Sequence, residues 1–257
     1  MKIDCHLHTL PFSQDAGQTI DELITALNEK KLRGILTEHM DYDFPLDPTI
    51  VTFDPQEYFA HYEPYRNDRL LLGVEAGLME SCRDRNNALA KDYPWDFFLV
   101  SIHTLYGKDL CNREFCLDRD QKTVYRDYLL DLIKETEALD DFDSLAHIDY
   151  ICRYNHYEDS NFYYRDYPDY WDQLFRILAE KEKALEINTR RFLTPNAPES
   201  LFELLQRFRE LGGKYLTIGS DAHLPRTVGH HIDAAYAMAE KANLRPVFFK
   251  KRQLNYL

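Results

Sequence analysis

Seven short apolar runs recur along the chain, and helical spacing of apolar residues follows them. This alternation is typical of βα units, in which a helix covers the strand before it. The runs predict strands over residues 2–8, 34–39, 70–76, 97–103, 144–148, 184–188 and 215–220. Since each strand carries its own helix, we expect a parallel sheet that closes into an α/β barrel resembling a TIM barrel.

Local helix signals agree with this repeat. Thr19 and Glu22 form a capping box, and Asp54 with Pro55 opens another helix. Gly212 and Gly213 follow a third helix, at the place where a left-handed residue is favoured. Apolar stripes at helical spacing comprise Ile20, Leu23, Ile24 and Leu27; Tyr125, Tyr128, Leu129 and Leu132; Trp171, Leu174, Phe175 and Leu178; and Leu201, Leu204, Leu205 and Phe208.

Composition narrows the class of protein. No linker, repeat or low-complexity segment divides the 257 residues, so we expect one domain over residues 1–257. The formal net charge of −13 repels a phosphate backbone, which argues against nucleic-acid partners. Because the chain has no membrane-length apolar run and no signal-peptide pattern at its start, we expect a cytoplasmic protein without a membrane partner. The five scattered cysteines form no C-x-x-C pair and are expected to be reduced.

Histidines carry the main chemical signal. Six of the ten fall at or just beyond the carboxyl end of a predicted strand, and such ends converge on one mouth of a barrel. Side chains alternate along a strand, so His6 and His8 face the same side. Corresponding positions of other units hold Glu38, His39, Glu75, His103, His147, Asp221 and His223. Imidazole and carboxylate groups are ligands for zinc, manganese or iron, so the sequence predicts a metal centre at the C-terminal ends of the strands.

Eight motifs then appear in order: DCHLHT, SQDAG, TEH, GVEAG, SIHT, AHIDYICRY, EINTRR and GSDAH. With them the chain resembles the polymerase and histidinol phosphatase (PHP) family over nearly its whole length, and within it the histidinol-phosphate phosphatases. The resemblance implies a distorted (β/α)7 barrel with two to three divalent ions (Zn, Mn or Fe). It also implies a metal-dependent phosphomonoesterase of histidine biosynthesis, which hydrolyses L-histidinol phosphate to L-histidinol and phosphate.

Alternative functions stay open at this point. Another PHP phosphoesterase would act on nucleotides, nucleoside bisphosphates or phosphotyrosine, and the metal ligands do not distinguish these substrates. A nuclease-like member is disfavoured by the net charge and by the lack of an appended polymerase region. A binding domain on a degenerate barrel is disfavoured because the ligand set is nearly complete.

The resemblance also implies a role for each ligand residue. The first ion would take His6, His8, Glu75 and Asp221. Glu75 would bridge to the second ion, which His103 and His147 complete. The third ion would take Asp15, His39 and His223. Asp221 would orient the attacking water or accept its proton. His223 or His39, whichever is not committed to a metal, would protonate the leaving oxygen.

Arginines supply the remaining candidates. A phosphate monoester carries about two negative charges, and the guanidinium fork matches its oxygens. Arg153 follows one strand and Arg190 and Arg191 follow another, so all three are expected at the mouth, with either Arg190 or Arg191 binding phosphate. For the substrate's ammonium group the candidate partners are Asp41, Asp43 and Asp149.

Overall fold

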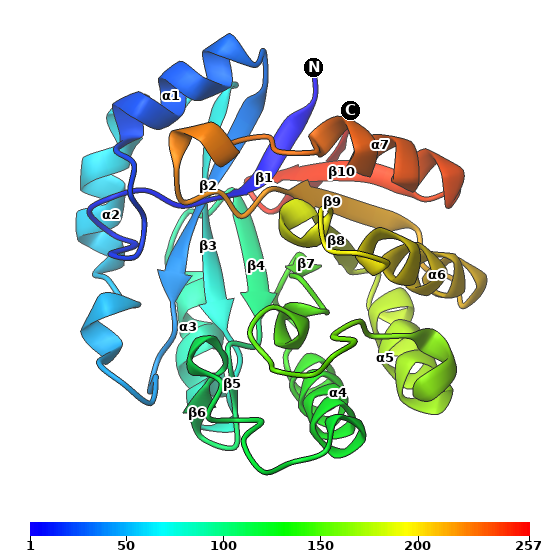
Figure 1. Ribbon diagram of the computed structural model, residues 1–257. Coiled ribbons are helices and arrows are strands. Elements are labelled where there is room, and N and C mark those ends of the chain that lie inside the picture. Colours follow the sequence, from blue (N-terminus) through cyan, green and yellow to red (C-terminus); the bar gives the residue numbers. More distant parts are fainter.

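The computed structural model describes residues 1–257 apart from the side chain of Pro48. One sheet runs in the order β1-β2-β3-β4-β7-β8-β9-β10-β11, and its first seven strands pair in parallel (Figure 1). These seven strands are β1 (Ile3–Leu7), β2 (Arg33–Met40), β3 (Leu70–Gly77), β4 (Phe97–Ser101), β7 (Ser144–Leu145), β8 (Ala184–Asn188) and β9 (Tyr215–Gly219). They are the seven strands that the apolar runs predict, and several end a few residues earlier than expected.

The barrel closes between β1 and the residues that follow β9. Leu7 and Ala222 form a parallel bridge, and the His8 amide donates to the Ala222 carbonyl over 3.1 Å. The Asp221 amide in turn donates to the His6 carbonyl over 2.9 Å. Because the backbone bridge to β1 lies beyond the end of β9, at Ala222, the result is a distorted seven-stranded α/β barrel.

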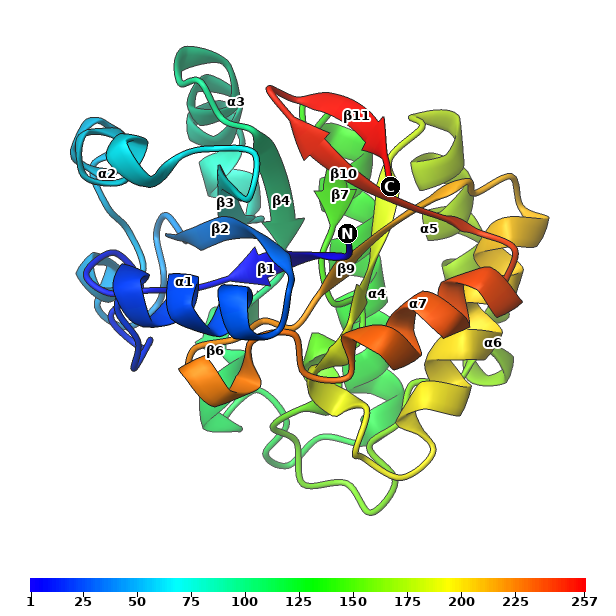
Figure 2. The same cartoon turned by 90° about the horizontal axis from the view of Figure 1, so that it is seen from above.

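The β10–β11 hairpin at the C-terminus was not foreseen. The first residues of β10 (Arg245–Lys250) pair in parallel with the start of β9, and β11 (Gln253–Tyr256) folds back on β10. Phe249 stacks on Phe97, the first residue of β4, with ring centroids 5.6 Å apart. The hairpin lies beside β4 and covers the amino-terminal end of the barrel (Figure 2).

The helices surround the strands (Figure 1). The capping box of Thr19 and Glu22 is formed, Asp54 caps the next helix, and Gly212 has the left-handed φ of 99° that its position favours. No helix in the described part of the chain is long and apolar enough to cross a membrane. The helices are α1 (Ile20–Glu29), α2 (Pro55–Tyr62), α3 (Arg83–Asp92), α4 (Gln121–Ala138), α5 (Pro168–Glu180), α6 (Ala197–Glu210) and α7 (Ile232–Lys241).

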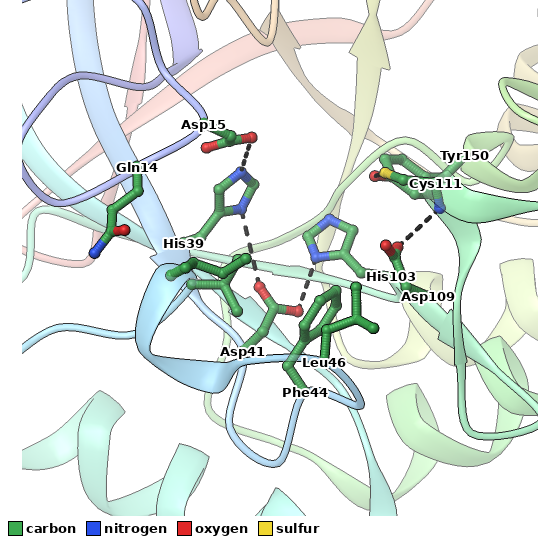
Figure 3. Close-up of a pocket in the computed structure, with 12 residues that line it drawn as sticks. Gln14, Asp15, His39, Asp41, Phe44, Leu46, His103, Asp109, Cys111 and Tyr150 are labelled. Carbon is green, nitrogen blue, oxygen red and sulfur yellow. Dashed lines mark hydrogen bonds and ion pairs between the residues drawn. The ribbon is translucent and has the colours of Figure 1, made fainter.

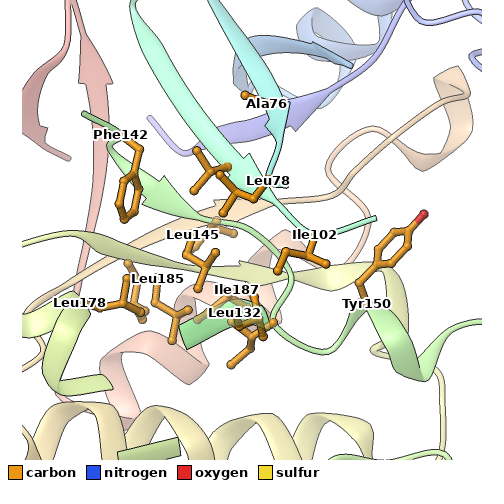
Figure 4. Close-up of a cluster of buried hydrophobic side chains, with 14 of the residues drawn as sticks. Ala76, Leu78, Ile102, Leu132, Phe142, Leu145, Tyr150, Leu178, Leu185 and Ile187 are labelled. Carbon is orange, nitrogen blue, oxygen red and sulfur yellow. The ribbon is translucent and has the colours of Figure 1, made fainter. Parts of the chain in front are cut away.

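Two apolar clusters form the core. The larger one packs the strands against the helices, and Figure 4 shows Leu145 and Leu185 of the sheet near Leu132 and Leu178 of α4 and α5. The smaller one comprises the opposite side chains of the strands together with the β10–β11 hairpin. Along β3 that inner face changes from apolar Leu71 to Glu75 within four residues. The barrel interior is therefore apolar at its amino-terminal end and polar at its carboxyl-terminal end.

Candidate metal centre

The nine predicted ligands converge at the carboxyl-terminal end of the barrel. His6 and His39 lie within strands β1 and β2, and Glu75 lies within β3. The others follow strand ends, except for Asp15, which comes from the loop between β1 and α1. Eight of the nine are buried or nearly so, whereas the Asp15 side chain is 54% exposed.

Glu75 lies at the centre of this group. Its Oε2 is 3.3 Å from His6 Nε2 and 3.7 Å from His8 Nε2. Its Oε1 is 2.8 Å from His147 Nε2 and 3.2 Å from His103 Nε2. Oε2 also lies 2.9 Å from His39 Nδ1. The two oxygens of one carboxylate therefore face two different sets of imidazoles, which is the geometry that a bridging carboxylate requires.

Asp221 completes the first of these groups. Its Oδ1 is 3.4 Å from His8 Nε2 and 3.8 Å from His6 Nε2. The residue has a left-handed φ of 54°, and its amide is held by the His6 carbonyl at the barrel closure. The closure thus positions this carboxylate beside the two histidines of β1.

A third group lies nearer the surface. Asp15 Oδ2 is 3.0 Å from His223 Nε2 and 3.6 Å from His39 Nε2. The His8 ring stacks between the other two imidazoles, with centroids 4.2 Å from His39 and 4.3 Å from His223. The third predicted ligand set is therefore brought together and adjoins the first.

The far ring nitrogens of the buried histidines are held by other side chains. His6 Nδ1 pairs with Glu186 Oε1 at 2.7 Å, and His103 Nδ1 pairs with Asp41 Oδ1 at 2.8 Å. Metal-binding histidines are typically oriented in this way by a carboxylate. His6 Nε2 and His8 Nε2 are buried and make no hydrogen bond with any described residue, so neither nitrogen is committed to a protein partner. The donor set and these unpaired nitrogens fit divalent metal ions.

His8 is held through a hydroxyl instead. Its Nδ1 is 3.2 Å from Ser13 Oγ, which donates to Glu38 Oε2 over 2.5 Å. Ser13 Oγ also accepts a hydrogen bond from the His39 amide at 3.2 Å. Burial raises the pKa of Glu38 to about 7, although hydrogen bonds from Ser13 and Thr9 oppose that shift. Ser13 thus links His8, His39 and the loop that carries Asp15.

Electrostatics act differently on the carboxylate and on the imidazoles of the centre. Burial by itself would raise the pKa of Glu75, but charged His6, His103 and His39 hold that pKa well below its usual value. Burial lowers the pKa of His147. Burial opposes a charge on His6, His39 and His103 as well, but neighbouring carboxylates raise the pKa of all three. Glu75 is therefore in the form that binds metal, whereas these three imidazoles lose a proton when an ion binds.

Two of the three predicted arginines reach the same cavity. Arg153 is buried and donates to Asp221 Oδ2 over 2.6 Å. Arg190 Nη1 lies 3.6 Å from Asp221 Oδ1 and 3.3 Å from His223 Nδ1. Both guanidinium groups line the cavity that the ligands of the metal centre enclose.

Arg191 points elsewhere. Its Nη1 donates to Asp149 over 2.8 Å and its Nη2 to Asn161 over 2.9 Å. Arg191, Asp149 and Asn161 are all buried. Arg191 is not among the residues that line either cavity at the metal centre. The structure therefore separates the two neighbouring arginines, which the sequence left as alternatives.

A second cavity of about 380 Å³ adjoins the metal centre (Figure 3). Five residues line both cavities, namely Asp15, His39, His103, Cys111 and Tyr150. The second cavity has apolar side chains from the segment after β2, among them Phe44, Leu46 and Val51. One end of the combined space is thus cationic and lined by metal ligands, and the other is apolar and acidic.

Comparison with known proteins places the chain in a family. The model of the PHP domain matches residues 4–190. A probable histidinol-phosphatase of Clostridium acetobutylicum is 41% identical over 256 residues, covering 100% of both chains. This chain belongs to the PHP domain family.

Two further relatives of this PHP domain come from Lactococcus lactis. A histidinol-phosphatase is 30% identical over 94% of this chain and 91% of its own. A crystal structure of histidinol phosphate phosphatase, complexed with zinc, L-histidinol and phosphate, superposes with a TM-score of 0.92 at 28% identity. That superposition covers 99% of this chain and 98% of the other. The expected barrel and the expected family are therefore confirmed, whereas the assignment of individual ligands stays a prediction.

The sequence analysis missed the side chains that support the ligands of this PHP domain. Glu186 lies in the quoted motif EINTRR, Ser13 opens SQDAG, and Glu38 was noted at a strand end but given no role. Their positions resemble those of ligands, because Glu186, for example, lies near the carboxyl end of β8. Which acids bind metal and which support a histidine depends on contacts between strands, which the motifs do not reveal.

Proposed function

We propose that this chain is a metal-dependent phosphomonoesterase that hydrolyses L-histidinol phosphate to L-histidinol and phosphate. The observation that carries the proposal is Glu75, whose two oxygens face separate sets of histidines beside the cavity that Arg153 and Arg190 line. Full-length relatives named histidinol-phosphatases support this choice of substrate.

The residues present would hold up to three divalent ions. In the first group we place His6, His8, Glu75 and Asp221; in the second, Glu75, His103 and His147; in the third, Asp15, His39 and His223. Such ions, when bound, neutralise charge on phosphoryl oxygens and make water a stronger nucleophile near neutral pH.

Arg153 and Arg190 bind the phosphoryl oxygens in this proposal. Arg153 Nε is buried and has no hydrogen-bond partner among the described residues, so it offers a free donor. Arg190 is more exposed and lies at the rim of the cavity, beside His223. A charge-assisted contact from each arginine would orient the phosphorus for attack.

The remaining step is proton transfer. Water attacks phosphorus, the bond between phosphorus and the histidinol oxygen breaks, and that oxygen takes up a proton. Asp221 accepts or orients the proton of the water, because its carboxylate lies between His8 and Arg153. The acid is His223 or His39, whichever does not bind an ion, and His223 also contacts the phosphate-binding Arg190.

A steady-state comparison of monoesters tests the proposal. The metal-loaded protein is assayed with L-histidinol phosphate, glycerol phosphate, p-nitrophenyl phosphate and a nucleoside monophosphate. We expect kcat/KM for L-histidinol phosphate to exceed the others by at least about 100-fold, because a site built around a charged amine rejects substrates that lack it. Equal values across the panel, or a preference for the nucleotide, would overturn the substrate assignment.

A further inference from the structure

The second cavity contains three carboxylates, and two of them already have partners. Asp15 faces His223 and His39, and Asp41 holds His103 Nδ1. The third is Asp109, which lines the cavity on the side of Cys111 and Tyr150 (Figure 3). Only Asp109 is therefore available to an incoming cation without displacing a contact to the metal centre.

Asp109 is buried but half unpaired. The residue is 7% exposed, and its Oδ1 accepts a hydrogen bond from the Cys111 amide at 2.8 Å. Its Oδ2 remains accessible and makes no hydrogen bond with a described residue, and no cationic side chain in the described part of the chain lies within ion-pair distance of this carboxylate. An accessible carboxylate that lines a binding cavity and has no partner from the chain can pair with a cationic group of a ligand.

The fold presents this carboxylate on a rigid element. A hairpin of β5 (Thr104–Leu105) and β6 (Lys108–Asp109) directly follows the ligand His103. Its two turn residues, Tyr106 and Gly107, have φ of 54° and 67°, as in the tight turns that join antiparallel strands. The Leu110 amide donates to the His103 carbonyl over 3.0 Å. The hairpin therefore ties Asp109 to the metal centre.

We propose that Asp109 pairs with the ammonium group of the substrate and thereby sets the preference for amino-alcohol phosphates. The inference rests on the proposed function and names the residue that selects its substrate. Phosphate binds at the arginine end of the combined cavity, the organic part of the substrate enters the apolar end, and its ammonium group meets the free Asp109 oxygen. A monoester without an amine leaves that carboxylate unpaired and is disfavoured.

The three acids that the sequence suggested for this role are engaged elsewhere. Asp41 belongs to His103, and Asp149 forms a buried pair with Arg191. Asp43 is half-exposed and pairs with Arg85. The structure thus redirects the role to an acid that no sequence motif marked.

The test compares two substrates on Asp109→Asn. Asparagine keeps an acceptor for the Cys111 amide, so the hairpin is preserved while the charge is lost. The substrates are L-histidinol phosphate and 3-(imidazol-4-yl)propyl phosphate, which lacks only the amine. We expect the ratio of their kcat/KM values to fall about 10- to 100-fold, mostly through KM for the amine-bearing substrate. Metal content equal to that of the wild type verifies that the centre is intact.

Each result has a defined meaning. Asp43→Asn is the matched control, because it removes a paired acid outside the cavity, and its ratio should equal that of the wild type. An unchanged ratio in Asp109→Asn, or an equal loss with both substrates, overturns the role of Asp109. The proposed function fails separately, if the wild-type protein itself does not prefer L-histidinol phosphate to the other monoesters.

Discussion

Arg153 donates to Asp221 Oδ2 over 2.6 Å, while Oδ1 of the same carboxylate faces His8 Nε2 at 3.4 Å. One aspartate thus joins a proposed phosphate-binding arginine to the proposed first metal ion. Neighbouring charges strongly shift the pKa of Asp221. Burial would raise the pKa of Asp221, but Arg153 and His6 hold that pKa well below its usual value. The carboxylate is therefore ionised wherever the enzyme is folded near neutral pH.

Replacing Arg153 should lower activity because the transition state loses a stabilising contact. We expect Arg153→Ala to reduce kcat/KM for L-histidinol phosphate about 10- to 100-fold, since a charge-assisted contact contributes about 1.5–3 kcal/mol. Steady-state kinetics measure this loss. Arg176→Ala on the outer face of α5 is the control, because it removes an exposed arginine. Normal kinetics in Arg153→Ala would remove this residue from phosphate binding.

Replacing Arg190 should impair activity, whereas replacing Arg191 should impair stability. Arg190→Ala should raise KM or lower kcat with little change in stability, because its side chain is 40% exposed. Arg191→Ala leaves Asp149 buried without its partner, so we expect the free energy of unfolding to fall by about 3–5 kcal/mol. Urea unfolding followed by circular dichroism measures this change. If Arg191→Ala is as stable as the wild type, the buried pair has no structural role.

Glu75→Ala should be the most damaging change of a ligand. It removes the carboxylate whose two oxygens face separate sets of histidines, so two ions lose a ligand together. We expect metal analysis of the purified variant to show loss of bound metal, and activity to fall to less than about a tenth. Glu80→Ala, which removes an exposed partner of Lys134, is the matched control. Full metal content in Glu75→Ala would refute the bridging assignment.

Glu186→Gln tests whether the Glu186 carboxylate orients the proposed metal ligand His6. The amide no longer carries the charge that holds His6 Nδ1 at 2.7 Å, so metal affinity should fall about 10- to 100-fold. Titration with zinc, competed by a chelator of known affinity, measures the change. Glu182→Gln removes an exposed acid that pairs with Lys214 and should leave affinity unaltered. Equal affinity in both variants would show that Glu186 does not orient His6.

The barrel strands were predictable because their signal is local. Each carries a continuous apolar run with a helix after it, and the βα alternation leaves few topologies. The β10–β11 hairpin was missed because Arg245, Pro246 and Lys250 interrupt its apolar pattern. Its stability comes from packing Phe249 against Phe97 across the bottom of the barrel, a contact between distant segments.

The ligand residues were predictable for a related reason. His6 and His8 lie two apart on one strand, and the carboxyl ends of parallel strands share one edge, so strand position alone brings such residues together. The roles of the acids were not predictable. Asp41 and His103 are 62 residues apart, and Glu186 and His6 are 180 apart, yet each pair is in direct contact.

By itself the sequence determined the α/β repeat, the order of the ligand motifs and the family. The repeat follows from the local spacing of apolar residues, and the family follows from short motifs along the chain. Only the tertiary structure decided which of two adjacent arginines faces the cavity, and which acid stays without a partner inside it. Arg191 pairs with Asp149 away from the cavity, whereas Asp109 lies on the β5–β6 hairpin with no cationic partner from the chain. Pairing of charges is a matter of distance and burial, and both are set by the packing of remote segments rather than by neighbours in the chain.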